Sequence, residues 1–191
     1  MNLPNKLTTL RLLIVVVMTV IYCVFSNVAW VMYTLMALFI VGSFTDFLDG
    51  VIARKYNMVT GFGKLMDPLA DKLLVISAIL ILINASVPYL YWWVALIVIA
   101  RELFVLGIRL AAIEGDGKVI AADKLGKLKT MTQMISISVL FLYSALILSY
   151  ESTFVHVMLY VSLALFYVSV LLCVISGIQY FILNKKYFKM R

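Results

Sequence analysis

The sequence predicts an all-α integral membrane protein with six transmembrane helices, on the basis of its composition, its apolar stretches and the placement of its cations. Of the 191 residues, 65% are hydrophobic and only 13% are charged, whereas a soluble domain has about 45–50% apolar and about 25% charged residues. A water-soluble fold of this composition would have to expose many apolar side chains. Intrinsic disorder is excluded as well, because it needs low hydrophobicity and high charge.

Six apolar stretches are long enough for transmembrane helices, each of which needs about 20 residues. They run over Thr8–Ser26, Trp30–Ala53, Lys64–Ala85, Tyr89–Ile113, Leu125–Tyr150 and Phe154–Leu183. The breaks between them are short, so we expect consecutive helices to be antiparallel neighbours in a single domain over residues 1–191. The N-terminal part of the first helix is predicted to lie at the membrane interface, because it carries the polar residues Asn5, Thr8, Thr9 and Arg11.

The placement of the cations predicts the orientation. With the N-terminus in the cytoplasm, all 16 Lys and Arg residues fall on the cytoplasmic side of the predicted helices, and the outer connections carry only Glu151. Because the cytoplasmic loops of membrane proteins are enriched in Lys and Arg, both termini are predicted to be cytoplasmic. Topology thus explains the net charge of +7, and we expect no nucleic-acid partner.

Four aspartates lie at the cytoplasmic ends of two consecutive predicted helices. Asp46 and Asp49 end the second helix and are three residues apart, and Asp67 and Asp71 begin the third and are four residues apart. Each pair therefore lies on one helix face. A short inner connection makes the two helices neighbours, so the two pairs can meet.

These carboxylates need compensating charge, because a charged side chain inside a membrane is costly. Interfacial ion pairs could supply it, formed with Arg54, Lys64 and Lys72. This alternative would be enough to explain any one aspartate taken alone. Four aspartates on two facing helices instead predict a metal site. All-carboxylate ligation favours Mg²⁺, Mn²⁺ or Ca²⁺ over zinc, and two divalent cations would balance the four charges. Two metals about 3.5–4 Å apart are common in phosphoryl-type displacement.

Small residues between the aspartates complete a longer pattern, Asp46-x₂-Asp49-Gly50-x₂-Ala53-Arg54-x₈-Gly63-x₃-Asp67-x₃-Asp71. It resembles the signature of the CDP-alcohol phosphatidyltransferase family at each of eight fixed positions. Further segments are similar to those of the bacterial members that make phosphatidylglycerophosphate. These are Pro4-Asn5-x₂-Thr8-x₂-Arg11, Ala100-Arg101-Glu102, Arg109 and Gly126-Lys127-Leu128-Lys129-Thr130.

The resemblance implies a six-helix enzyme, usually a homodimer, in the bacterial plasma membrane with an active site open to the cytoplasm. It implies transfer of the phosphatidyl group of CDP-diacylglycerol to sn-glycerol 3-phosphate, which gives phosphatidylglycerophosphate and CMP. The implied ligands of two divalent cations, Mg²⁺ or Mn²⁺, are Asp46, Asp49, Asp67 and Asp71. Asp71 is also the implied general base, unless the metals acidify the acceptor hydroxyl and Asp71 mainly orients it. The implied CDP-lipid pocket comprises Asn5, Thr8, Gly50, Ala53, Arg54 and Gly63.

A phosphorylated acceptor calls for several cations, and arginine offers bidentate contacts to phosphate. The candidates for this acceptor site are Arg101, Arg109, Lys127 and Lys129. For Arg101 the alternative is an internal ion pair with a carboxylate such as Glu102, because an arginine does not lie in lipid without a partner. For Lys129 the alternative is a role in topology and in attraction to anionic lipid.

Two other functions remain open at this point. The same chemistry could use inositol phosphate or phosphatidylglycerol as the acceptor. A divalent-cation transporter could use the four aspartates as its ion site, but transporters usually place such sites at the bilayer midplane between internal repeats. This sequence has no internal repeat, and its aspartates lie near one interface. Metal-dependent release of CMP would distinguish an enzyme from a transporter.

Overall fold

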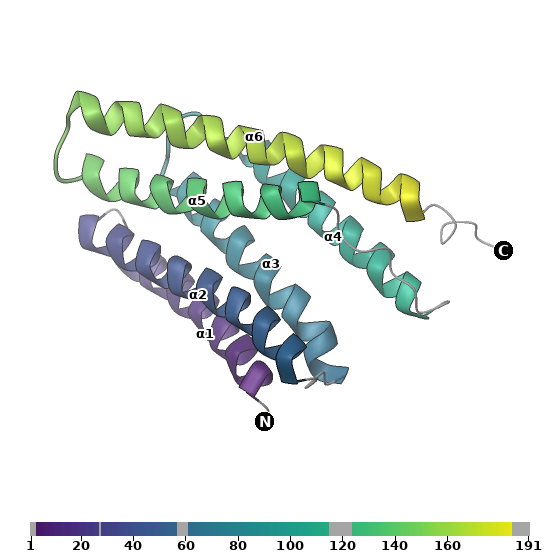
Figure 1. Cartoon of the computed structure of the whole chain (residues 1–191). Coiled ribbons are helices and arrows are strands. Elements are labelled where there is room, and N and C mark those ends of the chain that lie inside the picture. Colours follow the sequence, from purple (N-terminus) through teal and green to yellow (C-terminus); the bar gives the residue numbers. More distant parts are fainter. Residues whose placement is uncertain (1–2, 27, 57–60, 115–123, 185–191) are drawn as a thin grey trace.

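The computed structural model describes residues 3–26, 28–56, 61–114 and 124–184. Side chains are described for residues 6–26, 28–45, 66, 69–108 and 125–183. Within these ranges the chain forms six α-helices and no strand, as the sequence predicted (Figure 1). The helices are α1 (Leu3–Phe25), α2 (Ala29–Tyr56), α3 (Gly61–Asn84), α4 (Trp92–Glu114), α5 (Lys124–Ile147) and α6 (Thr153–Asn184).

Each helix coincides with one predicted apolar stretch, but several ends differ. The break predicted between the second and third stretches is shorter in the structure, because α2 continues to Tyr56 and α3 already begins at Gly61. The signature residues at these ends therefore lie on helices rather than in a loop. The helix α1 is continuous from Leu3, and its polar residues Thr8 and Arg11 are buried. An interfacial position for its N-terminal part stays a prediction.

The start of α4 at Trp92 rather than Tyr89 has a local cause. After α3, Ser86 adopts a left-handed conformation with φ of 56°. The amide N–H of Val87 donates a hydrogen bond of 3.3 Å to the carbonyl oxygen of Leu82. This is the pattern that closes the C-terminus of a helix. Tyr89 is left-handed as well, with φ of 61°, so the chain cannot re-enter a helix before the residues that follow it.

The helices pack into one bundle in which consecutive helices run in opposite directions (Figure 1). The helix α1 packs against α2 and α3, α2 also packs against α5, and α6 packs against α5 and α4. Large apolar side chains fill the centre. For example, the rings of Phe39 on α2 and Phe141 on α5 are both fully buried, with centroids 6.1 Å apart. The bundle therefore has an apolar interior.

The outer surface is apolar too, which is the reverse of a soluble protein. Val16 on α1 and Leu171 and Ile178 on α6 are more than half exposed. Among the described residues, three helices are long and apolar enough to cross a membrane, over Lys6–Phe25, Leu125–Ile147 and Thr153–Leu183. An apolar surface on long apolar helices is the arrangement that lipid stabilises, so this chain is a membrane protein.

One end of the bundle collects the ends of helices that carry the predicted site. The N-termini of α1, α3 and α5 and the C-termini of α2, α4 and α6 all lie at this end (Figure 1). The up-and-down topology has this consequence, because every second connection returns the chain to the same end. Residues that are far apart in the sequence, on α2, α3, α4 and α5, are thereby brought to one region.

Candidate active site

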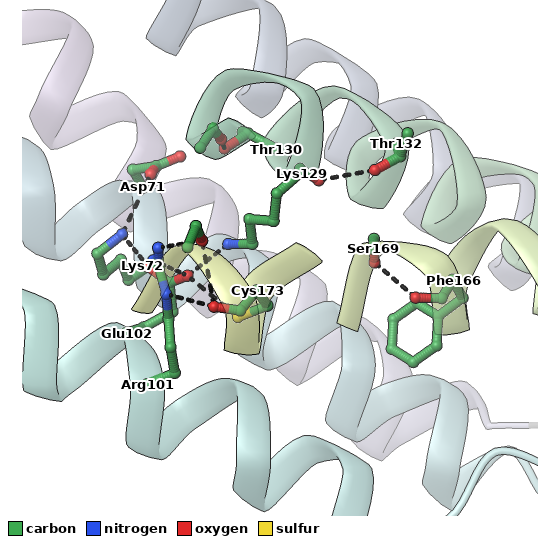
Figure 2. Close-up of polar contacts among 12 residues, drawn as sticks. Asp71, Lys72, Arg101, Glu102, Lys129, Thr130, Thr132, Phe166, Ser169 and Cys173 are labelled. Atoms are coloured by element: carbon green, nitrogen blue, oxygen red, sulfur yellow. Dashed lines mark hydrogen bonds and ion pairs between the residues drawn. The ribbon is translucent and has the colours of Figure 1, made fainter. Parts of the chain in front are cut away.

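A buried glutamate stands at the centre of the polar contacts at this end. Glu102 on α4 is only 3% exposed. Its Oε2 is ion-paired with Lys72 of α3, and its Oε1 is ion-paired with Lys129 of α5. The NH1 nitrogen of the adjacent Arg101 lies 3.1 Å from the same Oε1 (Figure 2). One carboxylate thus joins three cationic side chains of the described region, which offsets the cost of burying its charge.

Arg101 extends this cluster to the last helix. Its Nε donates a hydrogen bond of 3.0 Å to the carbonyl oxygen of Cys173, and its NH2 donates one of 2.8 Å to the hydroxyl of Ser176. Both acceptors lie on α6. We call Lys72, Arg101, Glu102 and Lys129 the Glu102 cluster. It connects α3, α4, α5 and α6 through charged or charge-assisted contacts, which are stronger than hydrogen bonds between neutral groups.

Asp71, the predicted base and metal ligand, borders the Glu102 cluster. Its Oδ2 lies 4.0 Å from Nζ of Lys72, the next residue on α3 (Figure 2). Its Oδ1 is buried and has no hydrogen-bond partner among the described residues. A buried carboxylate oxygen normally has a partner. A carboxylate oxygen that serves as a ligand of a hard cation such as Mg²⁺ or Mn²⁺ would need no other partner, so Asp71 fits the predicted metal site.

The other predicted metal ligands lie on the two helices that the sequence indicated. Asp46 and Asp49 are in the C-terminal half of α2, and Asp67 is one turn before Asp71 on α3. The helices α2 and α3 contact each other. The side chains of these three aspartates lie outside the described part of the structure, and among the side chains inside it no group of three or more His, Cys, Asp or Glu gathers. The four-aspartate site stays a prediction.

The predicted CDP-lipid pocket is represented by one described side chain. Thr8 is 1% exposed on α1, the helix that packs against both α2 and α3. It therefore lies in the group of helices that carries the signature. The remaining pocket residues belong to α1, α2 and α3, but their side chains lie outside the described part. They are Asn5, Gly50, Ala53, Arg54 and Gly63.

Of the cations predicted for the acceptor site, those with described side chains do not share one environment. Arg101 and Lys129 belong to the Glu102 cluster, so the internal pair of Arg101 with Glu102 is confirmed. Lys127 is exposed, whereas Lys129 is 6% exposed. The two lysines are two residues apart on α5 and so point in different directions. Arg109 lies on α4, two turns beyond Arg101, with its side chain outside the described part.

Lys72 and Glu102 are the residues whose roles sequence reasoning largely missed. The sequence suggests Lys72 as an ion-pair partner for the aspartates, and Glu102 as a partner for Arg101 within a segment similar to the family. The available signal was that an acid inside an apolar helix needs a cation. That signal does not say which cation of another helix will reach it.

Comparison with known proteins supports the family resemblance. Residues 1–175 match the CDP-alcohol phosphatidyltransferase family. Proteins named CDP-diacylglycerol–glycerol-3-phosphate 3-phosphatidyltransferase are similar over nearly the whole chain. The Bacillus subtilis (strain 168) protein is 39% identical, covering 96% of this chain and 95% of the relative. The Rickettsia bellii (strain RML369-C) protein is 38% identical, covering 98% and 97%. The Shigella flexneri serotype 5b (strain 8401) protein is 32% identical, covering 94% and 92%. The signature residues lie at the C-terminal end of α2 and the N-terminal end of α3, and the family match covers most of the chain. This chain therefore belongs to the CDP-alcohol phosphatidyltransferase family.

Proposed function

We propose that this protein transfers the phosphatidyl group of CDP-diacylglycerol to sn-glycerol 3-phosphate and thereby forms phosphatidylglycerophosphate and CMP. The observation that carries the proposal is the set of relatives named for this reaction, which are 32–39% identical and match at least 92% of their own length. The same relatives argue for glycerol 3-phosphate over inositol phosphate or phosphatidylglycerol as the acceptor.

The metal site would be formed by Asp46, Asp49, Asp67 and Asp71, as two carboxylate pairs on α2 and α3. Two divalent cations, Mg²⁺ or Mn²⁺, would neutralise the negative charge that develops on the diphosphate oxygens. The Oδ1 of Asp71, which is buried and lacks a hydrogen-bond partner among the described residues, supports this assignment. Four carboxylates brought together in this way would repel one another, which also argues for cations between them.

Asp71 would act as the general base. The acceptor hydroxyl oxygen attacks the phosphorus that bears the diacylglycerol group, and the hydroxyl proton passes to a carboxylate oxygen of Asp71. As the new P–O bond forms, the bond between this phosphorus and the bridging oxygen breaks. That oxygen leaves with the electron pair on CMP. A carboxylate is a weak base, so Asp71 must hold the hydroxyl within hydrogen-bond reach.

The CDP-lipid would lie over the C-terminal end of α2 and the N-terminal end of α3, which carry the signature residues, close to α1. Gly50, Ala53 and Gly63 would let the nucleotide approach the helix backbones, and Arg54 would face the diphosphate charge. Asn5 and Thr8 would complete the pocket from α1, which packs against both helices.

The acceptor phosphate would bind cations of α4 and α5. We propose Arg109 and Lys127 as its main contacts. Arg101 and Lys129, which the sequence also suggested, already contact Glu102. We therefore assign them a supporting position beside the phosphate rather than the principal contacts.

We further propose that all six described helices cross the membrane as a single domain, with both termini and the active site on the cytoplasmic side. The lengths of α2, α3 and α4 support this, since helices of 28, 24 and 23 residues exceed the roughly 20 residues needed to cross the hydrocarbon core. The bacterial relatives support a location in the bacterial plasma membrane. A homodimer is the expected assembly.

The experiment that tests this function measures CMP release by the purified full-length protein from CDP-diacylglycerol. Glycerol 3-phosphate, inositol phosphate and phosphatidylglycerol are supplied one at a time with Mg²⁺ or Mn²⁺. We expect release with glycerol 3-phosphate alone, reversible loss with EDTA and recovery on adding metal back. Release with another acceptor would contradict the acceptor assignment, and full activity in EDTA would contradict the metal site. A folded, metal-loaded protein that releases no CMP with any acceptor would favour cation transport.

A further inference from the structure

We propose that Glu102 is a positioning residue for Asp71. In this proposal Glu102 draws the ammonium group of Lys72 away from Asp71 and so keeps the Asp71 carboxylate open to a divalent cation. The proposal rests on the function proposed above, because it assumes that Asp71 binds metal. It assigns a role in metal binding to a residue on a helix that carries no metal ligand of the predicted site.

The position of Lys72 is the first observation. Lys72 follows Asp71 directly on α3, so its side chain can reach that carboxylate. Its ammonium nitrogen instead contacts Oε2 of Glu102 and remains 4.0 Å from Oδ2 of Asp71 (Figure 2). The lysine thus lies between two carboxylates and is held by the one on α4.

The anchoring of Glu102 is the second observation. Its side chain is buried, and Lys129 and Arg101 hold Oε1. Arg101 is itself fixed to Cys173 and Ser176 on α6. Glu102 therefore presents Oε2 to Lys72 from a position that contacts to α5 and α6 hold in place. Attraction between opposite charges is also stronger in such a buried environment than in water.

The consequence follows from the charges. If Glu102 became neutral, the nearest described carboxylate to the Lys72 ammonium would be Asp71. An ammonium group in contact with Asp71 would occupy oxygens that a metal needs, and it would repel the metal as a like charge. Loss of Glu102 should therefore weaken metal binding, and it should do so only when Lys72 is present.

The test measures Mn²⁺ binding to the full-length protein in detergent, without substrates, from the electron paramagnetic resonance signal of free Mn²⁺. The variants are Glu102→Gln, Lys72→Met and the two combined. We expect Glu102→Gln to raise the Kd for Mn²⁺ about 10-fold, as loss of an outer contact to a metal ligand often does. Lys72→Met alone should bind Mn²⁺ at least as tightly as the unaltered protein.

The double variant separates positioning from a purely structural role. Glu102→Gln combined with Lys72→Met should return the Kd to within about twofold of Lys72→Met alone, a departure from additivity that reports coupling between the two residues. The matched control combines Glu102→Gln with Lys129→Met. It removes a different cation of the Glu102 cluster and should leave Mn²⁺ binding weak.

Three results would overturn the proposal or its basis. An unchanged Kd in Glu102→Gln would refute the role of Glu102. A Kd that stays high after Lys72→Met is added would refute the route through Lys72. Active wild-type protein that binds no Mn²⁺ would instead refute the metal site of the proposed function.

Circular dichroism monitors the folding of each variant. If Glu102→Gln does not fold, Glu102→Asp with and without Lys72→Met gives the same comparison, with a smaller expected rise in the Kd for Mn²⁺.

Discussion

Arg101 donates a hydrogen bond of 3.0 Å from its Nε to the main-chain carbonyl oxygen of Cys173, and this bond ties α4 to α6. The other two guanidinium nitrogens contact Ser176 and Glu102. A side chain with each of its nitrogens used inside the protein holds helices together. These contacts favour a structural role for Arg101 over a direct contact with the acceptor.

Replacing Arg101 should mainly affect stability. Arg101→Ala removes contacts to Glu102, Cys173 and Ser176, and hydrogen bonds to charged groups contribute about 1.5–3 kcal/mol each. We expect a loss of at least about 2 kcal/mol, measured as a lower midpoint of thermal unfolding in detergent. Ser176→Ala removes one of these bonds and should cost less. An unfolding midpoint equal to that of the unaltered protein, together with a raised KM for the acceptor, would instead make Arg101 an acceptor ligand.

Replacing Asp71 should stop the reaction without unfolding the protein. Asp71→Asn keeps the size of the side chain but removes its charge and its ability to take a proton, and general bases typically contribute about 10²–10⁴-fold to the rate. We expect CMP release to fall by at least this factor, while the thermal unfolding midpoint stays close to that of the unaltered protein. A near-normal rate would contradict the role of Asp71 as the base.

Replacing the proposed acceptor contacts should affect one substrate. Arg109→Ala and Lys127→Ala each remove a cation from the proposed phosphate site. We expect the KM for glycerol 3-phosphate to rise about 10-fold or more, the effect of losing one hydrogen bond between charged groups. The KM for CDP-diacylglycerol should change little. The reverse pattern for Arg109 would move it to the nucleotide pocket.

Two glycines give a matched test of packing between helices. A Cβ at Gly42 on α2 would lie 2.8 Å from Cδ2 of Leu74 on α3, which is fully buried, whereas a Cβ at Gly107 on α4 would meet no atom within 4 Å. Gly42→Ala should destabilise by about 1 kcal/mol or more through overpacking. Gly107→Ala should be neutral or stabilise by about 0.5–1 kcal/mol through helix propensity. Equal unfolding midpoints for the two variants would contradict the close contact between α2 and α3.

The sequence by itself determined the helices and the family. Apolar stretches that end at polar breaks define where helices begin and end, so the six predicted stretches coincide with the six helices of the described region to within a few residues at most ends. The family signature could be recognised from the sequence because its residues lie close together along the chain. Its four aspartates, Asp46, Asp49, Asp67 and Asp71, have their characteristic spacing on two consecutive helices. The positions of these side chains relative to one another stay a prediction.

Only the tertiary structure decided how the cations are used. Lys127 and Lys129 are close in sequence, yet one is exposed and the other is buried against Glu102. The rotation of α5 was not readable from its sequence, because a helix with apolar neighbours on one side and lipid on the other has no clear polar face. Lys72 and Glu102 are 30 residues apart and meet because α3 packs against α4. A long-range pair of this kind depends on helix packing, which the one-dimensional pattern does not contain.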